Sequence, residues 1–245
     1  MRILLYSGSP ASLTRIAAEL RVNKTTVMRL LRTLEAEGLV RKNLTTGSYE
    51  LAMEFWLALA ARNPETLAAA RAAQRVLDEV VQATGEAVIL GLADTSLRAI
   101  VPVMWSAPEG TLRVDPHHLG PMPMHAVAPG KCYLASLSPE ELRQWAEKGL
   151  TRLARRTITS FRRLAKELAK VREAGYATTR EEAIRGCSGL AVPIVDDAGQ
   201  TAGGVQLLTL ASNLTEASMR RWLPILRDAS AKLSPLLHLI PQQGS

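Results

Sequence analysis

Apolar residues near the start of the chain recur at helical spacing in two short segments. In the first segment Ile16, Ala17 and Leu20 share one face, and Ser12 or Thr14 can cap its beginning. This spacing predicts a short helix that ends at Leu20 and packs its apolar face against a neighbour.

The second segment follows a four-residue break at 21–24 and predicts a helix over 24–37. Asn23 is its expected N-cap, and Gly38 lies just beyond its end. Four apolar residues of this helix fall on one stripe: Val27, Leu30, Leu31 and Leu34. We expect the whole stripe to pack on the core of a small helical head.

A ribbon and a connector follow the two helices. Residues 39–43 and 48–51 flank a turn at 45–47 and predict two short paired strands. Residues 52–62 have a helical pattern that ends at Asn63-Pro64. The predicted organisation is therefore a head over residues 1–51, a linker helix over 52–66 and a second domain over 67–245.

Beyond the linker, helical and strand patterns are mixed. Helices are expected at 67–84, after Ser138 with a capping box to Glu141, at 161–174 and at 215–238. Strands are expected at residues 86–93, 97–103, 176–180, 188–195 and 202–210. The stretch 104–130 is expected to be mostly loop. This order predicts an α+β domain with a mostly antiparallel sheet.

Composition narrows the class of protein without choosing a function. The 245 residues are 47% hydrophobic and 22% charged, which is typical of globular domains with a sizeable core. Two cysteines are too few for a disulfide framework and indicate a reducing compartment, so we expect a cytoplasmic protein. No apolar run is long enough for a secretory leader or a membrane span, and we expect no membrane partner. The net charge of +7 favours an anionic partner.

The face of the 24–37 helix opposite the apolar stripe carries the chemistry of DNA recognition. Arg29 and Arg32 can donate two hydrogen bonds each to guanine O6 and N7, and Thr25 can contact a thymine methyl group or a phosphate. Lys24 adds charge at a helix start, where free backbone N–H groups already favour phosphate. The candidate DNA contacts are Lys24, Thr25, Thr26, Arg29 and Arg32 in this helix, Arg41, Lys42, Ser48 and Tyr49 in the ribbon, and Thr14 in the first helix.

A plainer interpretation is that the head is an amphipathic helix pair with a solvated basic face. The order of helix, short turn, helix, glycine and basic hairpin favours the DNA-binding interpretation, because that order is typical of a winged helix-turn-helix. Residues 1–50 also hold eight Lys and Arg against four Asp and Glu, a net charge of +4.

At this point the chain resembles the IclR family of bacterial transcription regulators. The matching stretches follow the family's order and are LTRIAAELRVNKTTVMRLLRTLEAEGLVRKNLTTGSYEL at 13–51, MHAVAPGKCYLASLSPEEL at 124–142, RTITSFRRLAKELAKVREAGYATTREEAIRG at 156–186 and LAVPIVDDAGQ at 190–200. The resemblance implies a winged head, a linker helix and a GAF/PAS-like effector-binding domain. It also implies a homodimer or tetramer on a palindromic DNA operator.

The resemblance places the family's DNA contacts on residues that the helical face also selects. They fall at Lys24, Thr25, Thr26, Arg29 and Arg32, with support from Arg41 and Lys42. One departure is the start of the chain, where only about residues 1–6 precede Ser7 and the family usually has a full first helix. We therefore expect the second domain to contribute most to oligomerisation.

By the same resemblance the effector loop lies at 123–131. Gly130 after Pro129 lets backbone N–H groups approach a ligand carboxylate. The alternative is an ordinary strand-to-helix turn in which His125 is a buried histidine with satisfied hydrogen bonds.

The remaining effector candidates differ from those of small-acid sensors in the family. Where such sensors place Asp, Cys and two Ser, this chain has Thr179, Gly189, Gln206 and Leu208. The preceding loops hold three methionines and a tryptophan: Met104, Trp105, Met122 and Met124. The full candidate set is Trp105, Met122, His125, Ala126, Val127, Thr179, Cys187, Ser188, Gly189, Gln206 and Leu208. This roomier, more apolar set favours an aromatic or partly apolar acid, although the four substituted positions can also be plain core or surface.

Three other features carry less chemistry. His117-His118 lack the spacing of a metal site, so no metal is expected. Residues 152–172 hold eight basic side chains against Glu167 alone, which is typical of a solvated helix face but also suits DNA or an anionic effector. Cys132 and Cys187 have no neighbour that guarantees a lowered pKa, and we interpret them as structural.

Together these patterns predict a sequence-specific DNA-binding repressor of a catabolic operon, controlled by a small organic or aromatic acid, without catalytic residues or a cofactor. The alternative is a catalytic GAF-like domain with an accessory nucleic-acid-binding head. Against it, the sequence has no nucleophile elbow and no CxxC pair. A third possibility, an interaction module with a degenerate head, conflicts with the intact face of Thr25, Arg29 and Arg32.

Overall fold

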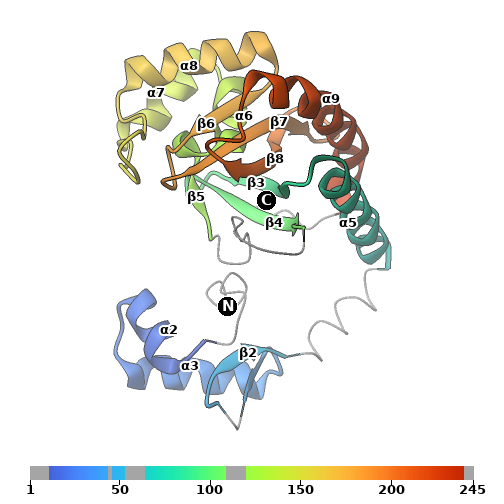
Figure 1. Ribbon diagram of the computed structural model, residues 1–245. Helices are drawn as coiled ribbons and strands as arrows, with labels where there is room; N and C mark the ends of the chain where they lie inside the picture. Colours follow the sequence, from blue (N-terminus) through green and yellow to red (C-terminus); the bar gives the residue numbers. More distant parts are fainter. Residues whose placement is uncertain (1–10, 44–45, 53–63, 109–119, 240–245) are drawn as a thin grey trace. The chain divides into compact units, whose positions relative to one another are not determined.

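The computed structural model describes residues 11–43, 46–52, 64–108 and 120–239 (Figure 1). The chain divides into two compact units, residues 1–67 and 68–245. Residues 1–10 and residues 53–62 of the expected linker helix lie outside the described residues. Among the described helices, none combines the length and the apolar character that a membrane span requires.

The head contains two helices and a two-stranded antiparallel ribbon. Its elements are α2 (Leu13–Leu20), α3 (Lys24–Ala36), β1 (Val40–Lys42) and β2 (Tyr49–Leu51). Both predicted caps are confirmed: the Ser12 side chain accepts from the Arg15 N–H, and the Asn23 side chain accepts from the Thr26 N–H at 2.8 Å. Arg21, with a φ of 55°, makes the turn between the helices. The helix-turn-helix follows from these local signals.

The core of the head is narrower than the apolar stripe predicts. It consists of Ala11, Ile16, Ala17, Val27, Leu31, Val40 and Tyr49. Leu30 is 50% exposed and Leu20 is 48% exposed, so the expectation that both pack inside is wrong. Leu30 lies about 60° around the helix from Val27, and a core covered by one short helix and a ribbon does not reach that far.

The order of helices and strands in the second unit is close to the predicted order. Its helices are α5 (Pro64–Thr84), α6 (Ala128–Ser136), α7 (Pro139–Glu147), α8 (Phe161–Ala174) and α9 (Glu216–Leu233), with 3-10 helices η2 (Met124–Ala126) and η3 (Ser234–Leu239). Its strands are β3 (Ala87–Asp94), β4 (Ala99–Ser106), β5 (Met122–Pro123), β6 (Ala177–Arg180), β7 (Cys187–Val195) and β8 (Thr201–Leu210). The predicted capping box between Ser138 and Glu141 is present at the start of α7.

One stretch differs from the prediction. Residues 104–130 were expected to be mostly loop, but Met104 and Trp105 lie in β4, and the effector loop forms η2 and the first turn of α6. Hydrogen bonding across the sheet explains the difference, because β4 pairs with β3 from Ala99 to Ser106. That pairing extends the strand to Ser106, past the end at Val103 that the sequence pattern predicted.

The six strands form one antiparallel sheet in the order β5-β4-β3-β8-β7-β6, between two layers of helices (Figure 1). On one face α5 and α9 pack through a cluster that includes Leu77, Leu90, Leu207 and Leu226. On the other face α6 and α8 bury Leu134, Leu164 and Leu168. The predicted α+β class with an antiparallel sheet is confirmed.

Glycines let the start of α6 lie close to its neighbours. A Cβ atom on Gly130 would stand 2.1 Å from the Met124 carbonyl oxygen, and one on Gly204 would stand 3.2 Å from the Cα of Pro129. Neither approach tolerates a side chain, so these two residues are what allow η2, α6 and the middle of β8 to meet. The effector loop is thereby held against the centre of the sheet.

Candidate DNA-binding face and effector pocket

The outer face of α3 presents the predicted recognition residues to solvent. Thr25, Arg29 and Arg32 are exposed, while Val27 and Leu31 on the opposite side are buried. Within the described part of the head, no carboxylate forms an ion pair with Lys24, Arg29 or Arg32. These cations are therefore available to an anionic partner, which is what a recognition helix requires.

The candidate DNA contacts in the ribbon interact with other residues of the head more than the sequence predicts. Arg41 forms an ion pair with Glu50 across the two strands, with Nη2 2.7 Å from the carboxylate. Part of its positive charge is therefore balanced within the ribbon. Lys42 lies with its ammonium 5.9 Å from the centre of the Tyr49 ring. Tyr49 is 5% exposed and belongs to the head core, because alternation along β2 points it inward and Glu50 outward.

Two more head candidates have clear positions. The Ser48 side chain is buried and its Oγ lies 2.5 Å from the Thr46 Oγ1, so it shapes the turn of the ribbon. Thr14 is exposed on α2. Ser48 and Tyr49 are thus buried, whereas Thr14, Lys42 and, on α3, Lys24, Thr25, Arg29 and Arg32 are exposed.

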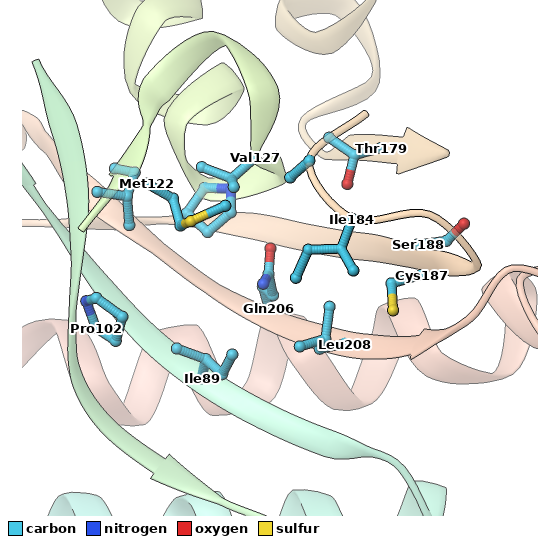
Figure 2. Close-up of a pocket in the computed structure, with 13 residues that line it drawn as sticks. Ile89, Pro102, Met122, Val127, Thr179, Ile184, Cys187, Ser188, Gln206 and Leu208 are labelled. Carbon is cyan, nitrogen blue, oxygen red and sulfur yellow. The ribbon is translucent and has the colours of Figure 1, made fainter. Parts of the chain in front are cut away.

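In the second unit a cavity of about 50 Å³ lies between the sheet, the start of α6 and the segment between β6 and β7 (Figure 2). It is lined by Ile89, Ile100, Pro102, Met122, Val127, Pro129, Thr179, Ala183, Ile184, Cys187, Ser188, Gln206 and Leu208. Seven of these are predicted effector contacts: Met122, Val127, Thr179, Cys187, Ser188, Gln206 and Leu208. Residues far apart in the sequence are thus brought to one site.

Two polar side chains converge in this mainly apolar cavity. Thr179 pairs with Gly189 across β6 and β7, and Gly189 pairs with Leu208 on β8. A Cβ atom on Gly189 would stand 2.9 Å from the Thr179 Oγ1 and 3.1 Å from the Gln206 Oε1. Gly189 therefore contributes by leaving room for those two groups, although it does not itself line the cavity.

Gln206 brings a buried polar atom without a partner to the cavity. Its side chain is 7% exposed, and within the described residues its Oε1 atom has no hydrogen-bond partner. A buried amide oxygen without a partner is costly, and a ligand with an O–H or N–H group would satisfy it. Figure 2 shows this amide pointing up from β8 into the space below Thr179 and Val127.

The cavity lining carries no formally charged side chain among the described residues. Burial raises the pKa of the Cys187 thiol, and the nearby Glu181 carboxylate raises it further. Cys187 is therefore held in the neutral, weakly nucleophilic form. Binding in this cavity depends on shape, apolar contact and a few neutral hydrogen-bonding groups.

Four predicted effector residues fall outside the cavity lining: Trp105, His125, Ala126 and Gly189. Trp105 pairs with Ile89 at the far end of β4, and its carbonyl accepts from Gln74. Ala126 is fully buried in η2. Alternation along β7 turns the Ser188 side chain to the sheet face opposite Gly189, and Figure 2 shows its hydroxyl pointing away, so Ser188 borders the cavity without offering that group.

His125 is a buried structural residue, as the plainer interpretation of the loop predicted. It is 2% exposed, and its Nε2 atom lies 2.9 Å from the Thr151 carbonyl, which can only accept, so Nε2 carries the proton. Its ring lies beside Trp145, with centres 6.2 Å apart. Burial lowers the pKa of His125 below its usual value, which keeps the ring neutral.

Sequence reasoning missed part of the cavity. The missed residues are Ile89, Ile100, Pro102, Pro129, Ala183 and Ile184. Ile89, Ile100 and Pro102 come from two strands whose inward face depends on a bulge between Leu90 and Gly91. Alternation could have proposed Ile89, but nothing in the local sequence shows which face of a doubly covered sheet holds a cavity.

The remaining features behave as structural elements. The basic residues of α8 are exposed on the side opposite Leu164, Leu168 and Val171, as a solvated helix face requires. Burial raises the pKa of Cys132 to about 12, so that thiol stays protonated. Within the described residues no group of three metal-ligating side chains is found, and His117-His118 lie outside them.

Comparison with known proteins identifies relatives over nearly the whole chain. Residues 1–44 match the family model IclR helix-turn-helix domain, and residues 65–235 match Bacterial transcriptional regulator IclR C-terminal. The DNA-binding transcriptional repressor YiaJ of Escherichia coli (strain K12) is 31% identical over 232 residues, which is 93% of this chain and 80% of YiaJ.

Two solved structures agree with these matches. The IclR transcriptional regulator from Alicyclobacillus acidocaldarius is 27% identical, with a TM-score of 0.81 over 96% of this chain and 95% of that one. The inducer-binding domain of a PobR double mutant from Acinetobacter, in complex with 3-hydroxybenzoic acid, is also 27% identical. Its TM-score is 0.62, over 68% of this chain and 97% of that domain.

The fold and these matches define a transcription regulator that has a helix-turn-helix DNA-binding domain and an effector-binding second domain. The chain belongs to the IclR family of bacterial transcriptional regulators.

Proposed function

We propose that this regulator is a repressor that binds a palindromic operator as a homodimer or tetramer and is released when an organic acid enters the cavity. The observation that carries the DNA-binding part is the exposed face of α3, where Arg29 and Arg32 stand without carboxylate partners in the described head. A two-fold protein requires a two-fold site, so the half-sites are expected about one helical turn, or a multiple of it, apart. YiaJ, which is itself a repressor, supports this direction of control.

We propose an aromatic or similarly apolar acid as the effector. Its ring would lie among Ile89, Met122 and Leu208, and its polar substituent would meet the Gln206 amide and the Thr179 hydroxyl. Its carboxylate would lie at the backbone of Val127, where α6 begins and free N–H groups favour negative charge. The complex of the PobR domain with 3-hydroxybenzoic acid supports this class.

This placement uses only part of the effector candidates expected from sequence. Trp105 and Ala126 do not line the cavity, so the ring would contact Ile89 and Ile100 in place of Trp105, and the carboxylate would meet Val127 alone. Signal transfer to the heads would use the 52–66 linker, by changing the spacing between two heads of an oligomer. A regulator that binds DNA would act in the cytoplasm.

A catalytic role for the second domain has less support. A hydrolytic or redox site needs an acid, a base or an activated nucleophile, and the one cysteine of the cavity has a raised pKa. Incubation of the purified chain with aromatic acids, followed by chromatography of the acids, separates the two functions: recovery of unchanged acid supports a sensor, and turnover supports an enzyme.

The test of the proposed function is selection of bound duplexes from a random pool, with and without a candidate acid. We expect an enriched inverted repeat whose recovery falls when 3-hydroxybenzoate or benzoate is present. Enrichment of a single, non-repeated element would contradict the dimer, and no enrichment would contradict sequence-specific binding.

A further inference from the structure

The segment between β6 and β7, residues 181–186, forms one wall of the cavity and is called the wall segment here. Ala183 and Ile184 line the cavity, and Figure 2 shows Ile184 reaching over the space toward Leu208. The segment is closed on itself, since the Glu181 N–H donates to the Cys187 carbonyl and the Gly186 N–H donates to the Glu181 carboxylate, both at 2.9 Å. It is therefore a compact turn, and its position helps to set the width of the cavity.

A buried cation ties this wall to the opposite side of the cavity. Lys131 stands on α6, one turn after Val127, and its side chain is fully buried. Its ammonium donates to the Glu182 carboxylate at 2.7 Å and to the Thr178 carbonyl at 3.0 Å. The helix that supplies Val127 and Pro129 is thus joined by an ion pair to the segment that supplies Ala183 and Ile184.

The buried pair is the main electrostatic tie of the wall segment. A second contact, between Arg156 and Glu181 at 3.4 Å, is outside, and its side chains are 54% and 25% exposed. Exposed pairs are screened by water and contribute little, whereas a buried charge that loses its partner is strongly destabilised. The Thr157 hydroxyl also donates to the Glu182 carbonyl at 2.6 Å, which fixes the backbone but carries no charge.

Neither member of the pair lines the cavity, and the cavity is tight. Only about 50 Å³ of it is open to the centre of a water molecule. An outward movement of the wall segment would widen the cavity for a ring-bearing acid. The side chain that resists this movement is Glu182.

We propose that Lys131 and Glu182 are positioning residues that hold the wall segment against α6, and that release of this tie controls how readily a ligand enters and leaves the cavity. This proposal depends on the proposed function at one point, which is that the cavity is the effector site. Two features of Glu182 favour breaking of its ion pair with Lys131. Within the described residues the second carboxylate oxygen of Glu182, Oε2, has no partner, and burial raises the pKa of that carboxyl against the opposing effect of the Lys131 ammonium.

Hydrogen–deuterium exchange of the full chain tests the tie directly, without any ligand. In Glu182→Gln, which keeps the shape and removes the charge, the peptide covering 181–187 should exchange about tenfold faster, while peptides from β3 and β8 stay unchanged. Glu167→Gln is the matched control. Glu167 is on α8, 3.8 Å from the same ammonium, but it is not part of the wall, so this variant should leave 181–187 protected.

A double variant keeps the test decisive if Glu182→Gln does not fold. Lys131→Met with Glu182→Leu removes both charges at similar volume, a change that buried pairs often tolerate. It should show the same local increase in exchange. Unchanged exchange at 181–187 in both variants, or a rise that is uniform over all peptides, would overturn the proposal and leave the pair a general stabiliser.

The rates of ligand binding then test whether the ion pair controls access to the cavity. Stopped-flow measurement with 3-hydroxybenzoate as the probe should show association and dissociation each about tenfold faster in Glu182→Gln than in Glu167→Gln. Equal rates in the two variants would overturn the control of entry. If the chain selects no operator DNA, the proposed function fails, yet the exchange result still decides whether the wall is tied.

Discussion

The head and the effector domain place their functional residues on the chain in opposite ways. The recognition residues of the head lie within the thirteen residues of α3, whereas the cavity draws on positions from Ile89 to Leu208. On a helix the 3.6-residue period separates a buried face from an exposed one, so the function of α3 follows from local spacing. The cavity exists only where distant strands and a helix meet, so its residues share no period. A surface function is thus easier to predict from sequence than an enclosed one.

The two regions also differ in charge. Lys24, Arg29 and Arg32 are exposed cations without carboxylate partners in the described head, while Lys131 of the effector domain is buried and paired with Glu182. DNA binding should therefore weaken steeply with salt, because phosphate contacts release counterions. Effector binding should depend on salt far less, since the cavity lining is uncharged.

The largest expected effect is on the stability of the head, and it should differ between two adjacent leucines of α3. Leu31→Ala removes a side chain that is 3% exposed and should cost about 2–5 kcal/mol of head stability, whereas Leu30→Ala, at a half-exposed position, should stay within about 0.5 kcal/mol. Urea unfolding followed by circular dichroism measures both. Equal losses would show that the head buries the full apolar stripe, for example in an interface between copies.

The next effect concerns the cavity. An aromatic acid at a hundredfold excess over its Kd should stabilise the chain by about 2.7 kcal/mol in a thermal-shift screen. Gly189→Ala should abolish this shift, because its Cβ would stand 2.9 Å from the Thr179 Oγ1 and 3.1 Å from the Gln206 Oε1. Leu208→Ser should move the preference toward glyoxylate and pyruvate. Stabilisation of the unmodified chain by two- and three-carbon acids alone would refute the aromatic class and leave the DNA-binding assignment intact.

A comparable effect is expected on DNA. Arg29→Ala and Arg32→Ala should each cost about 1–3 kcal/mol of operator affinity and relax specificity at one position of each half-site. Lys42→Ala should weaken all sequences alike and flatten the salt slope by roughly one unit. Fluorescence anisotropy measures these changes, with Arg143→Ala on α7 as a control that should bind normally. Full affinity in both arginine variants would remove α3 from the recognition role.

The smallest effect is a pH dependence of the effector domain. Because burial lowers the pKa of His125 below 6.5, the unfolded state binds a proton more readily than the folded state. The contribution of this neutral histidine is complete above about pH 6.5 and declines as the pH falls below it. His125→Gln can still donate to the Thr151 carbonyl but does not titrate. Its melting temperature should therefore fall less between pH 8 and pH 5, and identical slopes would contradict the assignment.

Local patterns identified most of the elements, and their failures have physical causes. Periodicity and caps predicted α2, α3, α8 and the capping box of α7, because these depend on residues within a few positions of each other. The expected loop at Met104 and Trp105 is part of β4 because pairing with β3 satisfies its backbone. Tyr49 has the composition of a wing residue, but the inward face of β2 places its ring in the core.

By itself, the sequence determined the helix-turn-helix, the cationic face of α3 and the antiparallel character of the second domain, since spacing, caps and turns act locally. Only the tertiary structure decided which candidates share a cavity. It placed Thr179 and Gln206 over Gly189, removed Trp105 and His125 from the lining, and brought Ile184 across from Leu208. It also buried Lys131 against Glu182, fifty-one positions away along the chain. Contacts of that range depend on strand order and on how closely glycines let α6 approach the sheet, and no local pattern of residues encodes them.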